Sequence, residues 1–112
     1  MGLDQWLFAN KNGRDKDDIE LGYWRKVNEL QGYFERNYDL ENCDNKYMTE
    51  QEIVSIIYDL EFRFEEEFTP TSGFFYGNYP MDKEDRFYTL YTFQKALRLK
   101  QDGFDIWYTC WY

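Results

Sequence analysis

The sequence predicts an α+β domain with about three helices and a small antiparallel sheet formed by its N- and C-terminal strands. Two segments place apolar residues at helical spacing behind a helix-capping residue, one after Thr49 and one after Asp82. The two ends of the chain are instead rich in aromatic, Leu and β-branched residues, as strands are. A chain of 112 residues has room for one hydrophobic core, so we expect a single domain over 1–112.

The strand predictions rest on residues 3–10 and 105–111. The first segment mixes Leu with aromatic residues in near-alternation, and Lys11-Asn12-Gly13 ends it as a turn. A charged loop over 14–18 follows. Antiparallel pairing of the last segment with the first would tie both strands to the body of the domain, and we expect that pairing.

Three segments have the periodicity of helices. The first is expected over 22–38. The second begins after Thr49, where Glu52 completes a capping box, and is expected to end within 67–69. The third is expected over 83–101, with Asp82 as its N-cap and Gly103 just beyond its end. The stretch 70–80 between the second and third helices is interrupted by Gly and Pro and predicts a structured loop.

Charge excludes several classes of partner. The chain has 22 acidic and 13 basic residues and a formal charge of −9, which argues against direct binding of DNA, RNA or an anionic membrane. Aromatic residues make up 22% of the chain, which favours a folded domain over a disordered one. The apolar stretches are short and interrupted by charge, so we expect no membrane span, no signal peptide and a cytoplasmic location.

Residues that carry enzyme chemistry are scarce. The chain contains no histidine, which removes the common nucleophile–histidine pairs and histidine-ligated metal sites, and it contains no phosphate-binding glycine motif. Cys43 and Cys110 are expected to be free thiols. The carboxylate pair Asp82 and Asp85 is better explained by capping than by metal binding. We therefore expect no catalytic residues, no metal, no cofactor and no enzyme activity.

The negative charge is concentrated in one segment. Residues 49–68 hold seven acids and one base, a net charge of −6. Acids near the start of a helix favour its positive end, whereas acids at the other end are slightly unfavourable and need another explanation, either solvation or function. The candidate interaction surface consists of Asp59, Glu61, Glu65, Glu66 and Glu67.

A second candidate site combines cations with aromatic residues. Arg25 and Lys26 lie beside Tyr23 and Trp24 in a chain that is otherwise short of positive charge, so they could hold a phosphate or carboxylate while Trp24 stacks on a base. The alternative is that Trp24 belongs to the core and the cations pair with nearby acids. A loop that offers hydroxyls and backbone N–H groups could complete the pocket through Thr71, Ser72 and Phe74.

Five segments of the chain carry a family resemblance: the opening MGLDQWL (1–7), the segment GYWRKVN (22–28), Asn42-Cys43, the loop PTSGFFYG (70–77) and the aromatic ending over 106–111. Together they resemble a family of small phage and prophage proteins. They span nearly the whole chain, and none is a catalytic signature. The resemblance implies a location in an infected or lysogenic bacterial host, where small acidic phage proteins often bind and disable host or defence proteins.

Three functions follow as expectations. The leading one is a non-enzymatic phage protein that engages and inhibits a host or anti-phage defence protein with a basic surface, through acidic and aromatic residues and with nucleic-acid mimicry as one form. The first alternative is a protein that binds or sequesters a small nucleotide signal. The second alternative is a structural or assembly role in which aromatic residues form an oligomer interface.

Overall fold

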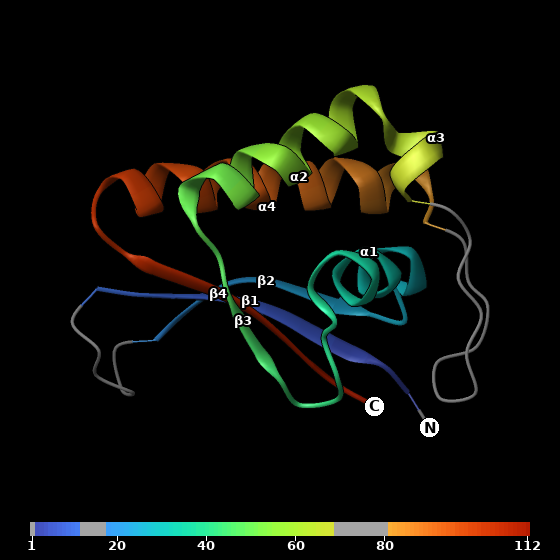
Figure 1. Cartoon of the computed structure of the whole chain (residues 1–112), viewed down its shortest axis with the longest axis horizontal. Coiled ribbons are helices and arrows are strands. Elements are labelled where there is room, and N and C mark those ends of the chain that lie inside the picture. Colours follow the sequence, from blue (N-terminus) through green and yellow to red (C-terminus); the bar gives the residue numbers. More distant parts are fainter. Residues whose placement is uncertain (1, 12–17, 69–80) are drawn as a thin grey trace.

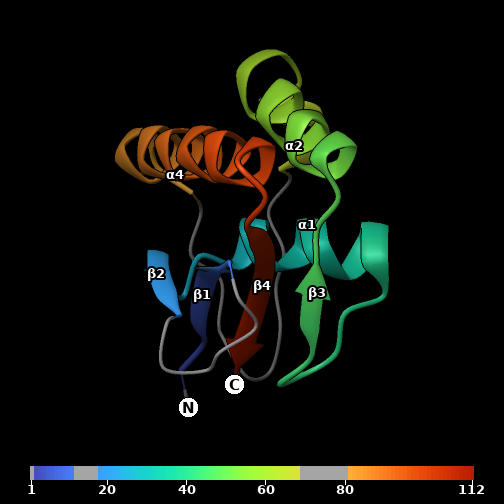
Figure 2. The ribbon, with the colours of Figure 1, turned by 90° about the vertical axis from the view of Figure 1, so that its left-hand side faces the viewer.

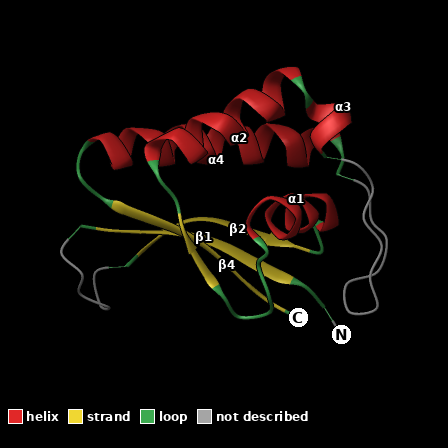
Figure 3. Cartoon of the chain, viewed as in Figure 1, coloured by secondary structure: helices red, strands yellow, loops and turns green. Residues whose placement is uncertain are grey.

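The computed structural model describes residues 2–11, 18–68 and 81–112, and it has the α+β architecture that the sequence predicts. In chain order the elements are β1 (Asp4–Asn10), β2 (Ile19–Arg25), α1 (Asn28–Tyr38), β3 (Asn45–Tyr47), α2 (Glu50–Phe62), α3 (Phe64–Glu67), α4 (Lys83–Gln101) and β4 (Asp105–Trp111) (Figures 1 and 3). Among the residues described, no helix combines the length and apolar character needed to cross a lipid bilayer.

The strands form one antiparallel sheet in the order β2-β1-β4-β3. β1 and β4 occupy its centre and pair over their full length, from Asp4 opposite Trp111 to Asn10 opposite Asp105. This register confirms the predicted pairing of the first and last strands. Because the central strands come from opposite ends of the sequence, the sheet holds both of those segments in place.

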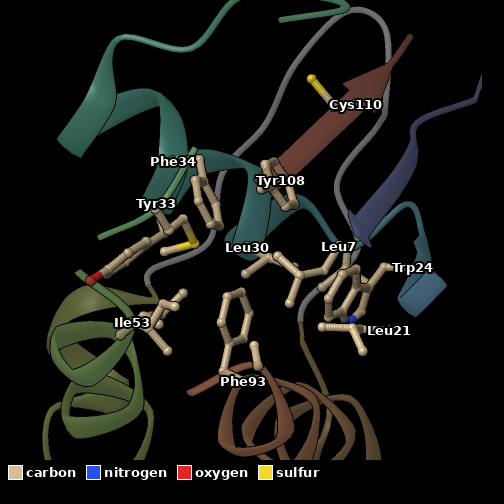
Figure 4. Packing of buried hydrophobic residues seen from close by; sticks show 14 of the residues in the cluster. Leu7, Leu21, Trp24, Leu30, Tyr33, Phe34, Ile53, Phe93, Tyr108 and Cys110 are labelled. Atoms are coloured by element: carbon tan, nitrogen blue, oxygen red, sulfur yellow. The ribbon is translucent and has the colours of Figure 1, made fainter. Parts of the chain in front are cut away.

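The helices cover one face of this sheet (Figures 1 and 2). The side chains beneath them come from alternate strand residues, as the pleat of a strand requires, and include Leu7 of β1 and Tyr108 of β4. Phe34 of α1 stacks on Tyr108 with ring centroids 3.8 Å apart, and Phe93 of α4 stacks on Trp24 of β2 at 6.1 Å (Figure 4). The core between the sheet and the helices thus combines stacked aromatic rings with a larger number of aliphatic side chains.

A chain of buried amides and a phenol links the sheet to α1. Gln5 donates from Nε2 to the Tyr108 hydroxyl (3.0 Å), which in turn donates to Oε1 of Gln31 (2.7 Å). The same Gln5 amide accepts from the Val27 N–H and donates to the Val27 carbonyl, both at 3.0 Å. These bonds satisfy polar groups that would be costly to bury alone, and they fix the position at which α1 begins.

β2 passes close to α4 at Gly22. A Cβ atom at this position would lie 2.6 Å from Cγ2 of Thr92 and 2.9 Å from Cη2 of Trp24, so only glycine allows the approach without displacement. The next residue donates its N–H to the Tyr88 hydroxyl of α4 (3.0 Å). This contact covers part of the exposed edge of β2, which would otherwise offer unpaired backbone groups.

The helix predicted over 22–38 is wrong in its first part. Residues up to Arg25 belong to β2, and α1 begins only at Asn28. Trp24 on the strand and Val27 before the helix both point into the core, so together they imitate the spacing of one helical face. The chain changes direction between them at Lys26, whose φ of 60° is left-handed and whose N–H donates to the Leu3 carbonyl (2.8 Å).

The other two helices begin where the sequence places them. The Thr49 capping box is present, and Asp82 caps α4 by accepting from the Asp85 N–H (2.8 Å). α4 ends at Gln101, with Gly103 at a φ of 97° beyond it. The second helix, however, breaks at Arg63 into α2 and the short α3, and the sequence did not indicate β3.

The face of the sheet opposite the helices is also aromatic. No described helix or strand lies against it (Figures 1 and 2). By the register of the strands, the aromatic side chains on this open sheet face are Trp6, Phe8, Tyr23, Tyr47, Trp107 and Trp111.

Candidate functional site

The candidate acidic segment starts at the N-terminus of α2, where side chains accept hydrogen bonds from backbone N–H groups. Glu52 donates its N–H to Oγ1 of Thr49 (3.1 Å), and the Thr49 N–H donates to Oε1 of Glu52 (2.9 Å). The second oxygen of Glu52 pairs with Nζ of Lys46 at 2.9 Å. Partial burial acts to raise the pKa of Glu52, but the Thr49 N–H and the Lys46 ammonium outweigh it and lower the pKa. Glu52 therefore has a structural role.

Asp59 does not belong to the exposed acidic surface, so its predicted place there is wrong. It is buried, and its Oδ2 accepts a hydrogen bond from the Tyr33 hydroxyl of α1 (2.8 Å). Burial, together with the hydrogen bond to Asp59, raises the pKa of Tyr33 far above its usual value, so the phenol remains a donor. Asp59 points towards α1, whereas Glu61, Glu65 and Glu66 are exposed to solvent.

Two of the three acids after the helix break pair with one arginine. The Arg63 guanidinium contacts Oε2 of Glu66 at 3.0 Å and Oε1 of Glu67 at 3.1 Å. Glu66 is exposed, whereas Glu67 is half-buried and its carbonyl accepts a hydrogen bond from Arg36 of α1 (2.6 Å). These pairs reduce the negative potential at this end, so Glu61 and Glu65 are the predicted acids that fit an external partner best.

A second arginine stabilises the end of α2 from outside. Arg86 of α4 donates to the carbonyl oxygens of Leu60 (3.0 Å) and Glu61 (3.1 Å), which lie in the last turn of the helix. Its guanidinium also lies over the Phe64 ring, 4.5 Å from the centroid. A cation at a helix C-terminus interacts favourably with the helix dipole, so Arg86 offsets the unfavourable position of the acids there.

α2 carries apolar side chains on its solvent side as well as on its core side. Val54, Tyr58 and Phe62 follow one another at four-residue spacing and are 47%, 54% and 68% exposed. The rings of Tyr58 and Phe62 are 5.1 Å apart. We call the exposed side of this segment the α2–α3 surface; it consists of Glu50, Gln51, Val54, Ser55, Tyr58, Glu61, Phe62 and Glu65.

Two open hollows lie along the α2–α3 surface. The larger, about 370 Å³, is lined by residues of the first half of α2, with Glu50 at one end and Tyr58 at the other. The smaller, about 220 Å³, surrounds the helix break at Arg63 and includes Phe62 and Arg86. The exposed apolar line therefore lines both depressions, Val54 and Tyr58 the larger and Phe62 the smaller, and both could accept side chains of a partner.

The predicted ligand pocket is not assembled among the described residues. Trp24 points into the core, where its indole N–H donates to Oγ1 of Thr89 (2.9 Å) (Figure 4). Tyr23 and Arg25 are exposed on the opposite face of the sheet, because neighbours along a strand alternate. Trp24 thus faces away from Tyr23 and Arg25. The remaining members of the predicted pocket, Thr71, Ser72 and Phe74, lie outside the described residues.

The other polar members of that predicted pocket have structural contacts. The Tyr23 hydroxyl donates to Oδ1 of Asp4 (2.5 Å), and this bond raises the pKa of the phenol. Lys26 occupies the left-handed turn between β2 and α1. Arg25 lies alongside Gly2, at which a Cβ atom would be 3.6 Å from the guanidinium.

The remaining described side chains with candidate chemistry are the two cysteines and the carboxylates. Both cysteines are free, with Cys43 exposed and Cys110 buried, and burial raises the pKa of the Cys110 thiol. Within the described ranges, no three acidic or cysteine side chains come together as metal ligands would.

Sequence reasoning identified the acids of α2 but missed its exposed apolar line. A signal was present: Val54, Tyr58 and Phe62 form a second stripe, offset by about 150° from the core stripe that includes Ile53 and Leu60. A helix with an apolar line on each side needs a second contact or exposes one line to water. Comparison of the chain with protein-family models, with curated proteins and with solved structures gives no match.

Proposed function

We propose that this chain is a non-enzymatic binding protein that engages another protein through the α2–α3 surface. The partner has an apolar centre and a basic rim. In the phage setting that the sequence resemblance implies, the partner is a host or defence protein that binding inhibits. The observation that carries the proposal is the exposed line of Val54, Tyr58 and Phe62 flanked by the carboxylates of Glu50, Glu61 and Glu65.

Burial of the apolar line contributes a favourable free energy of binding. Fully burying an aliphatic or aromatic side chain contributes about 1.5–3 kcal/mol, and about half of each side chain in this line is still exposed to water. A central aromatic cluster with charged residues around it is the usual anatomy of a protein interface. The ring contact between Tyr58 and Phe62 holds the two aromatic residues together before a partner arrives.

The carboxylates support the choice of a basic partner. Glu50, Glu61 and Glu65 are exposed, whereas the neighbouring Arg63 is already engaged by Glu66 and Glu67. Exposed charges of this kind steer association and select against acidic partners more than they add affinity. They also make the association rate sensitive to salt.

The geometry supports a mixed apolar and acidic interface better than imitation of a nucleic acid. A nucleic-acid mimic needs regularly spaced negative charges that a DNA-binding protein can contact in place of phosphates. Here Asp59 is buried and two further acids pair with Arg63. What remains exposed is a short acidic rim around an apolar line, which fits a compact protein surface.

The test compares matched variants of the full chain as bait in bacterial host lysate. Tyr58→Ser and Phe62→Ser each remove one exposed ring from the α2–α3 surface, and Tyr91→Ser removes an equally exposed ring from α4 as the control. We expect a captured protein that the first two variants lose and the control retains. Capture that is unchanged by both α2 variants would contradict the proposal.

A second experiment tests the acidic rim with the captured partner in purified form. Glu61→Lys combined with Glu65→Lys should lower the association rate by about tenfold or more at low ionic strength, and the difference should shrink in high salt. Surface plasmon resonance measures the association rates of the natural chain and of the variant at low and at high salt. An association rate that responds neither to salt nor to this charge reversal would assign binding to the apolar line alone.

A further inference from the structure

The open sheet face carries a layer of aromatic side chains that the α2–α3 surface does not explain. Three of them are well exposed: Tyr23 at 40%, Tyr47 at 56% and Trp111 at 59%. The exposed face of an antiparallel sheet ordinarily carries polar residues in alternation with the core. This sheet is instead apolar on both faces.

The rings on this face form two rows across the strands. In one row, Trp6 of β1 contacts Tyr23 of β2, with ring centroids 5.7 Å apart. In the other, Trp107 of β4 lies between Phe8 of β1 at 5.7 Å and Tyr47 of β3 at 5.2 Å. Such cross-strand ladders hold the rings in place and give a continuous aromatic surface across the sheet.

The charged strand residues on this face lie at the ends of the strands and at the β2 edge, outside the middle of the aromatic rows. Arg25 lies opposite Asp4 at one end, and Asp4 is bound by the Tyr23 hydroxyl. Glu20, opposite Phe8, and Asp105, opposite Asn10, lie towards the other end. Within the four strands, Arg25 is the only cation on this face, since Lys46 is opposite the core residue Tyr108.

We propose that the open sheet face binds a second copy of this chain, face to face, in a twofold-symmetric dimer. A twofold axis lying in the plane of the interface and across the strands reverses the strand direction of one copy relative to the other. Arg25 of each copy then lies over the end of the other copy that carries Glu20 and Asp105. The aromatic rows meet in the middle, as the inner faces of two sheets do in a sandwich.

The charges on this face favour a second copy over a nucleic acid. Aromatic rows on a sheet can also stack on unpaired bases, but such sites need cations along the backbone. The strand residues here provide three carboxylates, Asp4, Glu20 and Asp105, against the single cation Arg25. A self-complementary arrangement uses this distribution, whereas a phosphate backbone would be repelled by it.

The size of the face sets the expected strength of the dimer. Four neighbouring strands are about 19 Å wide, and a strand of seven residues is about 23 Å long. The flat area of the sheet face is therefore on the order of 400 Å² per copy, without the additional surface of protruding side chains. Two copies thus bury close to the roughly 1,000 Å² at which specific interfaces begin. We therefore expect a weak dimer whose population depends on protein concentration.

Sedimentation equilibrium of the full chain over a wide concentration range tests the proposal. We expect a monomer–dimer equilibrium that Trp111→Ser and Tyr47→Ser each weaken at least about tenfold, since each removes an exposed aromatic ring from a small interface. Tyr58→Ser, which removes a comparably exposed ring from the α2–α3 surface, is the control and should leave the dimer unchanged. A strict monomer at the highest concentration overturns the proposal, as does a dimer that only the control weakens.

Mixing of charge-reversed variants tests the orientation of the two copies. Arg25→Glu alone, and Glu20→Lys combined with Asp105→Lys, should each abolish the dimer because like charges then face each other. An equimolar mixture of the two variants should associate again, since each contact is once more between opposite charges. A variant that fails to fold would show no such rescue and a changed circular dichroism spectrum. Two folded variants that stay monomeric when mixed would contradict this arrangement.

Discussion

The open sheet face and the α2–α3 surface both expose aromatic rings, but they hold them differently. On the sheet, Trp107 is packed between Phe8 and Tyr47 and is only 9% exposed, although it lies on the outer face. On α2, Phe62 contacts Tyr58 and remains 68% exposed. The rings of the sheet therefore contribute to the stability of the monomer, whereas those of α2 add little to it. This difference separates a surface whose rings also stabilise the fold from one whose rings are available mainly for binding.

The largest expected effect tests this difference directly. Trp107→Ala removes the middle ring of the Phe8–Trp107–Tyr47 row and should lower the free energy of unfolding by about 2–3 kcal/mol. Phe62→Ala should change it by less than about 0.5 kcal/mol. Urea denaturation at low protein concentration, followed by circular dichroism, measures both values on the monomer. Equal losses in the two variants would remove the distinction between the surfaces.

The next effect distinguishes core from surface within α2 itself. Asp59→Ala takes the carboxylate acceptor from the buried Tyr33 hydroxyl and should cost about 2 kcal/mol. Glu61→Ala, two residues later and exposed, should cost less than about 0.5 kcal/mol.

A double-mutant cycle assigns that cost to the hydrogen bond. In a Tyr33→Phe background, which lacks the phenol hydroxyl, Asp59→Ala should have a clearly smaller effect than in the natural chain. The free energies of unfolding of all four proteins give the coupling. An equally large loss of stability in both backgrounds would mean that Asp59 stabilises the fold through a contact other than the Tyr33 hydroxyl.

The sequence predicted the parts of this molecule that local chemistry determines. Thr49 and Asp82 cap the helices that follow them because a cap needs only the next few residues. β2 was missed because its inward-facing Trp24 continues the spacing of the residues in α1. That ambiguity is resolved only when β1 is available as a pairing partner, which lies outside any local window.

The sequence predicted the acidic character of the candidate site but not which of its side chains lie on one surface. The acids of α2 are visible in the sequence, yet the burial of Asp59 depends on Tyr33, which is distant along the chain. The same limit applies to Tyr23 and Trp24, which looked like one pocket and lie on opposite faces of the sheet. Which side chains share a surface is decided by strand pairing and helix packing.

The smallest expected effect concerns a contact between β3 and α2, outside both surfaces. Lys46 belongs to β3 and pairs with Glu52 in the first turn of α2. Glu52→Gln removes this ion pair but keeps an oxygen that can accept from the Thr49 N–H, so the loss at neutral pH should be about 0.5 kcal/mol. A Lys46→Gln background should abolish most of this loss.

The pH dependence of that loss follows from the lowered pKa of Glu52 in the folded chain. Because the unfolded chain binds the Glu52 proton more readily, the stability that the carboxylate contributes is present above the unfolded pKa of a glutamate and lost as the pH falls through the folded pKa. The unfolding curves of Glu52→Gln and the natural chain should therefore differ at neutral pH and converge in acid. A gap that widened on acidification would mean that burial, rather than the Lys46 and Thr49 contacts, controls this carboxylate.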